Sequence, residues 1–496
     1  MKFTELSDYP LPAGTVTEWS PYTVTPESEW AIDLRPATFD HDLHLRRSVG
    51  DEAGNSWLGS VFEIDRRYDP VAFETTLRLW TARHEVLRST VVVDSSPVGP
   101  GGCLPGPDTH TGRLSRRHTH PAEAVAIGSH AVGRLTEEAI GPHLARLFDR
   151  DLSPLVWPHY RTVTITDLEA GAGGPGRFAV VLAADHCVVD AYSLLVAMHE
   201  IRSLYLAEAD GTDAALPGTG SHLDYGVHDH TMGAELTPMH PAVTHWRGFL
   251  AASGWQFPAF GLASAQPHLG MPDEHDTAAQ PGRSEFVMTA DSAAEVNQLC
   301  RAAGHSMQTT VITALALAHR AVTGERRMRA AMPMHTRHRP EYVDAIGWFV
   351  GLGPLDIDLD SAETFAEAMD VTVLAIEAAK AVSRYPYPRI AELIGCSAVP
   401  EFVISYLDVR YVPGAADWPL MKARTVRGRT ESDREVYLWV ARSPDGITVS
   451  TRHPGNRAAA TAISDFVDTA VSIISRVTTD GMGLRLDSLT AHRLPA

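Results

Sequence analysis

The sequence contains little cysteine and little positive charge. Four cysteines occur, at Cys103, Cys187, Cys300 and Cys396, and no close pair among them indicates a zinc or redox site, so we expect reduced thiols and no metal. The chain has 42 lysine and arginine residues against 61 aspartate and glutamate residues, a formal net charge of −19. This balance disfavours nucleic acid as a partner, because clustered cations are needed to bind phosphate backbones.

Long apolar runs are also missing. No uninterrupted apolar stretch approaches the roughly 20 residues of a membrane span, and residues 1–10 lack the apolar core of a signal peptide. We therefore expect a cytoplasmic protein without a membrane span. The average charge would repel an acidic carrier protein, so docking of one would need a local basic patch. Arg326, Arg327 and Arg329 are candidates, although a solvated strand edge explains this trio equally well.

The composition and length indicate a folded protein of two lobes. Apolar residues make up 44% of the 496 residues and charged residues 21%, as in ordinary folded proteins. A single hydrophobic core stops growing at about 250 to 300 residues, so two lobes are expected. Residues 207–220, rich in Ala, Gly, Asp and Thr, are the best candidate for the crossover. We place the first lobe in residues 1–215 and the second in residues 216–496.

Apolar periodicity predicts both helices and strands in each half. After an irregular start, the first half has predicted strands at 57–64, 91–93, 160–166 and 178–184, and helices that begin at Pro70 and Tyr192. The second half has predicted helices at 292–303, 307–323, 364–382 and 458–477, and strands at 328–334, 346–357, 402–408 and 435–450. Each half is therefore expected to be a strand-rich α+β assembly.

Several motif-like strings have simpler interpretations. Residues 171–176 match a dinucleotide fingerprint by letter but lead into a strand, so phosphate-binding geometry is not expected. His228-Asp229-His230 could chelate a metal, but no third ligand is evident, and an exposed loop is the favoured interpretation. The chain has no G-x-S-x-G elbow, P-loop or H-E-x-x-H, which disfavours serine hydrolases, nucleotide hydrolases and zincins.

The segment Asp185-His186-Cys187-Val188-Val189-Asp190 lies where a predicted buried strand ends and a helix begins. A side chain at such a turn can project into a cleft while rigid elements hold it. Histidine suits general-base chemistry because its ordinary pKa is near 6.5. Asp190 is equally a favoured helix N-cap residue. The residues alone leave two interpretations open: a catalytic His186, or a half-buried histidine ahead of an ordinary N-cap.

Residues 184–191, ADHCVVDA, resemble the HHxxxDG motif of the superfamily that includes nonribosomal peptide condensation domains, chloramphenicol acetyltransferase and the polyketide-associated acyltransferases of actinobacterial lipid synthesis. Other segments that resemble landmarks of this superfamily occur in the expected order along nearly the whole chain. They are Arg83–Arg88 (RHExLR in the superfamily), Phe148–Pro158, His245-Trp246 with Leu250, Met332–Arg337 with Ile346–Val350 (GxFxN), and Ser405–Arg410. Five landmarks in register favour the catalytic interpretation.

The resemblance implies an α+β fold of two chloramphenicol-acetyltransferase-like lobes in a V-shaped pseudo-dimer, with an active-site tunnel between them. It implies that His186 is the general base that accepts the proton of the acceptor. It also implies that Asp190 pairs with an arginine, for which Arg337 is the candidate, and holds the turn in shape. The residues expected to border the tunnel are Asp185, Ala191, Trp348 and Tyr406.

The chain departs from the superfamily pattern at three places. Asp185 replaces the first motif histidine, which is regarded as structural in the superfamily. Because neighbouring strand residues face opposite sides, we expect Asp185 to point away from the side that His186 serves. Ala191 replaces the closing glycine, which is a mild change if its φ is negative. The DFGWG motif of many peptide condensation domains is missing, and Asp417-Trp418 is its nearest counterpart.

The resemblance implies a free-standing, monomeric acyltransferase. It would move an acyl group from a CoA or acyl-carrier phosphopantetheine thioester, which a polyketide synthase could supply, to a hydroxyl or less readily an amine. We expect lipid or natural-product biosynthesis as the setting and no cofactor beyond the thioester substrate. Two alternatives stay open: an amide-forming condensation enzyme that acts on carrier-bound substrates, and a non-catalytic docking module.

Overall fold

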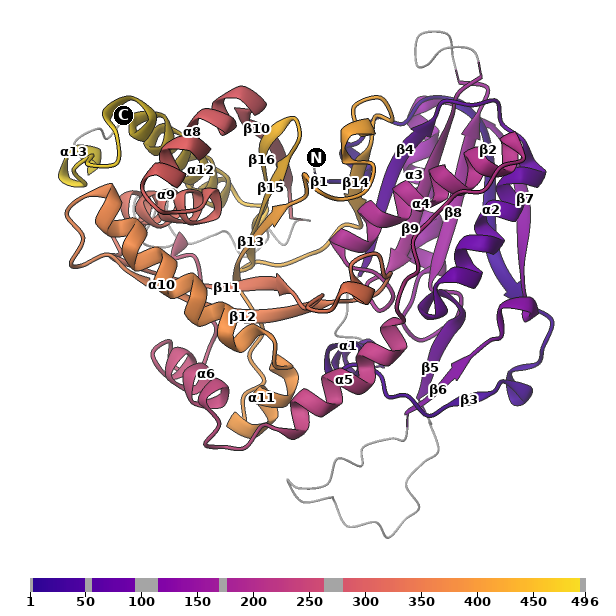
Figure 1. The fold of residues 1–496 in the computed structure, drawn as a ribbon, viewed down its shortest axis with the longest axis horizontal. Helices are drawn as coiled ribbons and strands as arrows, with labels where there is room; N and C mark the ends of the chain where they lie inside the picture. The colour runs from indigo at the N-terminus through magenta and orange to yellow at the C-terminus, as the bar shows by residue number, and fades with distance from the viewer. Residues whose placement is uncertain (1–2, 50–55, 94–114, 169–175, 263–279, 491–496) are drawn as a thin grey trace.

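The computed structural model describes residues 3–49, 56–93, 115–168, 176–262 and 280–490. These residues form two lobes side by side, each built on a β-sheet with helices packed against it (Figure 1). The predicted α+β class with two lobes is therefore confirmed. Cys103 and residues 171–175 of the glycine-rich string lie outside the described residues.

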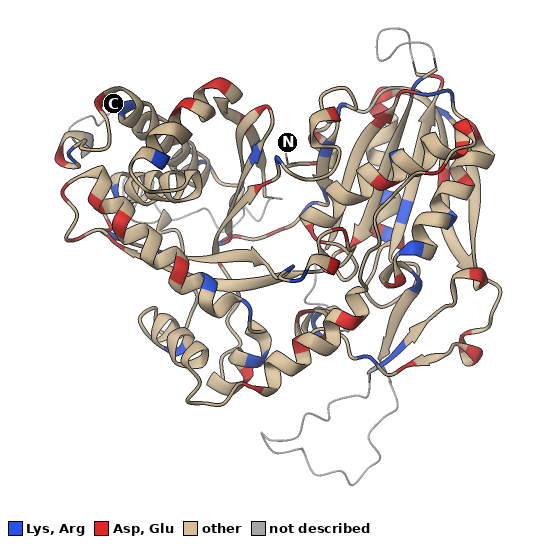
Figure 2. Ribbon diagram, in the orientation of Figure 1, with Lys and Arg blue, Asp and Glu red and all other residues tan. Residues whose placement is uncertain are grey.

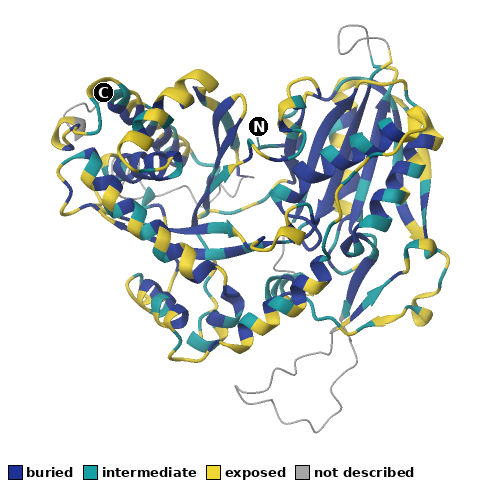
Figure 3. Cartoon of the chain, in the orientation of Figure 1, coloured by how far each residue is buried: buried dark blue, intermediate teal, exposed yellow. Residues whose placement is uncertain are grey.

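The first lobe contains a seven-stranded sheet with the strand of the motif at its centre (Figure 3). Its order is β1 (Phe3–Glu5), β14 (Arg424–Arg427), β4 (Trp57–Ile64), β9 (Phe178–Asp185), β8 (Tyr160–Thr166), β2 (Gly14–Thr23) and β7 (Val125–Leu135). Every residue of β9 is buried, because β4 and β8 flank this strand and the sheet is covered on both faces. Helices α2 (Pro70–Arg83) and α4 (Ala191–Asp210) pack on one face, and α3 (Glu137–Asp151) packs on the other.

Capping residues in the sequence explain where the helices beside β9 begin and end. Asp69 caps α2 by accepting hydrogen bonds from the backbone of the first turn, and Pro70 occupies its first position. The apolar spacing that predicted this helix places Phe73, Leu77 and Trp80 in the core. Helix α4 ends at Gly211, whose φ of 64° is a left-handed conformation that glycine adopts without strain.

The second lobe contains a six-stranded sheet. Its order is β10 (Gly282–Thr289), β16 (Gly446–Arg452), β15 (Val436–Ser443), β13 (Phe402–Asp408), β11 (Arg327–His335) and β12 (Val350–Asp358). Helices α8 (Ala290–Ala302), α9 (Met307–Thr323), α10 (Phe365–Ser383) and α12 (Arg457–Asp480) contribute to its main core. Helices α6 (Pro241–Ala251) and α11 (Tyr387–Ile394) form a second core with Ala331 and Val403 of the sheet.

The predicted division at residue 215 does not separate the two sheets cleanly. Strand β14, from residues 424–427, lies in the first sheet, where it pairs parallel with β1 and antiparallel with β4. The segment that precedes it packs Val412, Trp418 and Met421 into the core around α4. The second half of the chain therefore completes the first lobe and ties the two lobes together.

Three local predictions are corrected by the structure. The start of the chain is not irregular, because it supplies the ten-residue strand β2 and helix α1 (Phe39–Val49). His228-Asp229-His230 lies on helix α5 (His222–Ala234) and not in a loop. The apolar run at 435–450 is a hairpin of two strands, β15 and β16. In the first two cases, polar residues obscure the periodicity of elements that tertiary packing stabilises.

One helix in the described part of the chain, α12, is long and apolar enough to cross a membrane by length and composition. Its buried side chains, among them Ile463, Phe466 and Val477, join the main core of the second lobe. Its other face carries charged residues such as Asp465 and Asp468. This is the pattern of an amphipathic core helix.

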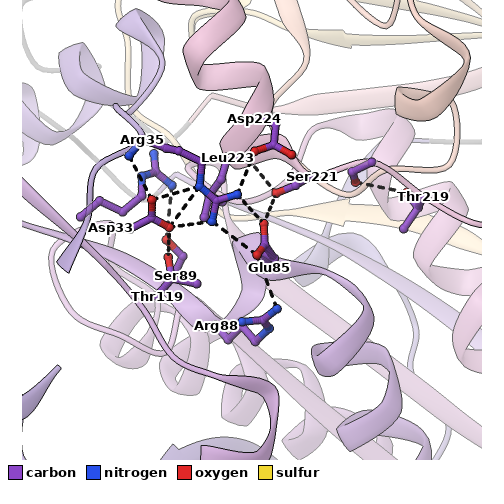
Figure 4. Close-up of polar contacts among 12 residues, drawn as sticks. Asp33, Arg35, Glu85, Arg88, Ser89, Thr119, Thr219, Ser221, Leu223 and Asp224 are labelled. Atoms are coloured by element: carbon purple, nitrogen blue, oxygen red, sulfur yellow. Dashed lines mark hydrogen bonds and ion pairs between the residues drawn. The ribbon is translucent and has the colours of Figure 1, made fainter. Parts of the chain in front are cut away.

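A cluster of charged side chains joins the crossover to the first lobe (Figure 4). Arg35 donates hydrogen bonds to Asp33, to Glu85 and to Asp224 at the start of α5, with shortest distances of 2.6, 2.8 and 2.9 Å. Glu85 belongs to the predicted RHExLR landmark, and it also accepts a 2.5 Å bond from the hydroxyl of Ser221, the N-cap of α5. Burial opposes ionisation of Glu85, but these donors hold its pKa below the ordinary value.

Substitution of Arg35 by methionine should destabilise the protein, because it removes the cation that pairs with two partly buried carboxylates, Asp33 and Glu85. We expect a loss of about 1–3 kcal/mol in the free energy of unfolding. Arg326→Met is the matched control: Arg326 pairs with Asp360 and both side chains are more than half exposed, so the loss should stay below about 0.5 kcal/mol. Equal losses in denaturant melts of the two variants would contradict the structural role of this cluster.

Candidate active site

The motif turn is closed by Asp190, which acts both as a helix cap and as an ion-pair partner. Its Oδ1 accepts a 2.7 Å hydrogen bond from the backbone N–H of Ser193, which makes it the N-cap of α4. Its two carboxylate oxygens also receive both terminal nitrogens of Arg337, at 2.6 and 3.1 Å. Asp190 is therefore both the N-cap of α4 and the ion-pair partner of Arg337.

Arg337 brings the second lobe to this turn. It lies two residues after the end of β11, and it donates further hydrogen bonds to the hydroxyl of Ser193 at 2.8 Å and to the carbonyl of Ala345 at 3.2 Å. Its guanidinium lies over the rings of Phe349 and Tyr192, 4.4 and 4.8 Å from their centroids. These contacts surround a nearly buried cation with acceptors and aromatic faces.

The segment that leads into β12 binds the same turn. The N–H of Phe349 donates to Asp190 at 3.0 Å. The N–H of Gly347 donates to the Ser193 hydroxyl, and that hydroxyl donates to the Gly347 carbonyl at 2.8 Å. Burial would raise the pKa of Asp190, but the charge and hydrogen bonds of Arg337 outweigh it and hold this pKa below the ordinary value. The turn is thus an ionised joint between the lobes that several hydrogen bonds hold.

Asp190→Ala should cost about 3–5 kcal/mol of stability, because it leaves the cation of Arg337 buried without a counter-charge and removes a helix cap. We expect a lower melting temperature together with a loss of turnover. A variant that melted like the wild type and yet lost turnover would contradict the scaffold role and assign Asp190 to the chemistry.

His186 stands at the first position of the turn after β9. Its backbone N–H donates to the carbonyl of Ser56 at 3.2 Å, which fixes the start of the turn. Its ring lies 4.1 Å from the centroid of the Trp348 ring, tilted by 39°. Burial lowers the pKa of His186, and its own backbone carbonyl opposes this. The imidazole is therefore neutral at neutral pH and able to accept a proton.

The nitrogen Nδ1 of His186 is buried and has no hydrogen-bond partner in any other described residue. No carboxylate is bonded to this ring within the described residues, so the arrangement differs from a Ser-His-Asp triad.

Asp185 does not border a tunnel with its carboxylate, because the residue is completely buried. The carboxylate accepts hydrogen bonds from the Ser56 hydroxyl at 2.5 Å and the Cys187 N–H at 2.8 Å, and it contacts Nε2 of His44 at 3.1 Å. Burial opposes ionisation, yet these partners hold the pKa of Asp185 well below its ordinary value. As predicted from the strand geometry, no hydrogen bond joins Asp185 to the His186 ring in the described chain.

Ala191 and Tyr406 were also expected to border the tunnel. Ala191 is the first residue of α4, and its φ is not positive. Alanine can therefore replace glycine here without backbone strain. Tyr406 lies on β13, and its hydroxyl is buried with no hydrogen-bond partner among the described residues. Burial raises the pKa of Tyr406 above its ordinary value. Its place beside a tunnel stays a prediction.

The first two residues of the landmark Arg83–Arg88 contact helix α4 at Glu200. Glu200 of α4 accepts hydrogen bonds from Arg83 at 2.8 Å and from the Trp80 indole at 3.2 Å, and it pairs with His84 at 2.6 Å. Burial raises the pKa of Glu200, but His84 and Arg83 reverse this. These residues therefore fix the helix that carries Asp190 and do not reach the motif turn.

The described residues support neither a metal site nor a basic patch for docking a carrier protein. Within the described ranges, no group of three or more His, Cys, Asp or Glu residues could hold a metal ion. The basic trio is neutralised or engaged: Arg326 pairs with Asp360, Arg327 pairs with Asp356, and Arg329 donates to Ser253. Figure 2 shows the same mixing of basic and acidic residues over much of the fold.

Four polar residues of the site were not found from the sequence. Ser193 had a usable signal, because a polar residue three positions after an N-cap aspartate is placed to share its bonds. His44, Ser56 and His222 had none: each reaches the site from an element distant in sequence. Nε2 of His222 donates a hydrogen bond to the Trp348 carbonyl at 3.1 Å, and the His222 ring fills the space beside Gly347.

Strand β9, the capped helix α4 and the turn between them meet Arg337, which follows β11, where the two lobes join. Residues 174–398 match the Condensation domain family. The acyltransferase PapA3 of Mycobacterium tuberculosis is 23% identical over 490 residues, which cover 96% of both chains. The trehalose-2-sulfate acyltransferase PapA2 of Mycobacterium bovis is 27% identical over 321 residues, which cover 62% of this chain and 65% of that protein.

Solved structures share the same fold. The PapA2 acyl transferase superposes with a TM-score of 0.79 at 21% identity and covers 96% of this chain and 100% of its own. The first condensation domain of the calcium-dependent antibiotic synthetase gives a TM-score of 0.66 at 17% identity and covers 92% and 99%. The predicted resemblance is therefore supported: the chain is similar to proteins named acyltransferases PapA3 and PapA2 and shares the fold of PapA2 and of condensation domains, which supports an acyltransferase enzyme.

Proposed function

We propose that the protein moves an acyl group from a CoA or carrier-protein thioester to a hydroxyl acceptor, with His186 as general base, in lipid or natural-product biosynthesis. The observation that carries this proposal is a neutral imidazole on a rigid turn between the two lobes, beside the Trp348 ring. We also propose that the enzyme acts as a cytoplasmic monomer without a resident cofactor.

In the proposed reaction, the free ring nitrogen of His186 takes the proton of the acceptor hydroxyl as its oxygen attacks the thioester carbonyl carbon. The carbon–oxygen bond forms, the carbon–sulfur bond breaks, and the leaving thiolate takes the proton back from the imidazolium. His186 ends the cycle neutral, as it began. Asp190 and Arg337 do not touch substrate in this scheme, because each is already bonded to the other.

The name of one relative favours a hydroxyl acceptor over an amine. One relative is named for its action on trehalose-2-sulfate, a sugar derivative that offers hydroxyl groups. Amide formation between carrier-bound substrates remains the alternative. The docking-module alternative is disfavoured, because a binding platform has no need for the neutral, tightly positioned His186.

His186→Ala should lower kcat/KM by about 10²- to 10⁴-fold, the usual contribution of a positioned base. The melting temperature should change little, because no other described side chain depends on a hydrogen bond from this ring. Turnover of the purified variant at the wild-type rate would remove His186 from the chemistry.

The pH dependence of the wild type provides a second check. Because burial lowers the pKa of His186, protonation should inactivate the enzyme only below its ordinary value of 6.5. We expect the decline of kcat/KM on acidification to be half complete below pH 6.5. A decline that is half complete above pH 6.5 would contradict a base with a lowered pKa.

The substrates can be identified by the exact mass of products. The protein is incubated with a panel of acyl-CoA and acyl-carrier thioesters and with alcohol and amine acceptors in competition. We expect an ester product that depends on His186. An amide product would favour the alternative reaction, and a stoichiometric protein partner without any acyl transfer would favour the docking module.

A further inference from the structure

The replaced first position of the motif is connected to a histidine from another part of the chain. His44 lies on α1, 141 residues before Asp185, and its Nε2 is 3.1 Å from Oδ1 of that carboxylate. The Ser56 hydroxyl donates to the other carboxylate oxygen and lies 3.3 Å from the same His44 nitrogen. Asp185 thus joins α1, the start of β4 and the catalytic turn.

The ring of His44 also reaches the residue that contacts the proposed base. It meets the Trp348 ring edge-on at 5.7 Å, with an interplanar angle of 80°. His186 contacts the same indole at 4.1 Å. The Trp348 backbone is held separately by His222, so contacts from both lobes restrict this residue. Two imidazoles therefore share one aromatic neighbour at the active site.

We propose that His44 is a positioning residue for the catalytic base: paired with Asp185, it holds Trp348 against His186 and adds a second ionisable imidazole to the site. This inference rests on the proposed role of His186. It explains the departure from the motif, because the second imidazole is supplied by α1 and the motif position supplies the carboxylate that anchors it.

Electrostatics support this geometry. Asp185 is completely buried and ionised, and a buried carboxylate of this kind needs donors or an opposite charge. After burial and its own carbonyl, the charged groups that act on His186 are His44, Asp190 and Asp185. Arg337 neutralises Asp190. Arg117 acts on Cys187, and His44 acts on His159, whose backbone carbonyl accepts a 2.8 Å hydrogen bond from the Asp185 N–H.

The direction in which His44 shifts the pKa of His186 follows from the repulsion of like charges. A positive charge on His44 lowers the pKa of His186, so it keeps the base neutral at acidic pH. Removing that charge should let His186 become protonated at higher pH. A role for His44 in packing alone would leave the titration of His186 where it is.

His44→Gln is the first test, because glutamine can still donate a hydrogen bond to Asp185 but cannot carry a proton charge. We expect the NMR titration midpoint of the His186 ring, assigned through His186→Ala, to rise. We also expect kcat/KM at pH 6 relative to pH 8 to fall roughly threefold below the wild-type ratio. His143→Gln is the control: it alters a His–carboxylate pair with Glu18 of the same lobe, and should change neither quantity.

The exchange variant His44→Asp/Asp185→His tests the pairing itself. It restores a histidine and a carboxylate with their places reversed, so it should recover much of the melting temperature and activity that each single substitution loses. It also serves if His44→Gln is unstable. An exchange variant no better than the worse single variant, or failure of both designs to fold, would give His44 a purely structural role and overturn the proposal.

The outcomes for His44 and for the proposed function are distinguishable. The ring titration needs no turnover, so it reports on His44 even if no thioester is accepted. An unchanged His186 midpoint in a folded His44→Gln protein contradicts the positioning role. Normal activity of His186→Ala contradicts the proposed function, whatever the titration shows.

Discussion

The ion pair between Asp190 and Arg337 is the constraint on which the site depends. Asp190 caps the helix that follows the motif, and Arg337 follows a strand of the other lobe, so a single pair sets both the local turn and the register of the lobes. Both side chains are less than 5% exposed. A buried charge without its partner strongly destabilises the folded state, so the protein needs both side chains of the pair.

The same pair keeps Asp190 out of the reaction that we propose for His186. The two carboxylates nearest to the base are each fully engaged elsewhere, Asp190 by Arg337 and Asp185 by His44 and Ser56. No carboxylate is hydrogen-bonded to the His186 ring in the described chain, and burial lowers the pKa of His186 more than Asp190 and Asp185 raise it, so the imidazole is neutral. A base of this kind is ready at neutral pH, and its orientation comes from the backbone turn and from the Trp348 ring.

The sequence predicts the parts of the site that local pattern determines. Strand β9 and helix α4 follow from an apolar run and from helical spacing, and the Asp190–Arg337 pair follows from the resemblance of two short motifs. Contacts made across the fold leave no such pattern. His44 meets Asp185 through packing of α1, and β14 is a four-residue strand whose place is decided by its neighbours. The polar helix α5 was missed because its histidines and aspartates hide its apolar face.

A double-mutant cycle on Asp190 and Arg337 tests the central claim most directly. Asp190→Ala, Arg337→Ala and the double variant are compared with the wild type in free energy of unfolding and in turnover. The account predicts that each single variant loses about 3–5 kcal/mol and that the double variant loses clearly less than their sum. Additive losses would contradict it, because they would mean that the turn and the join between the lobes do not depend on one shared pair.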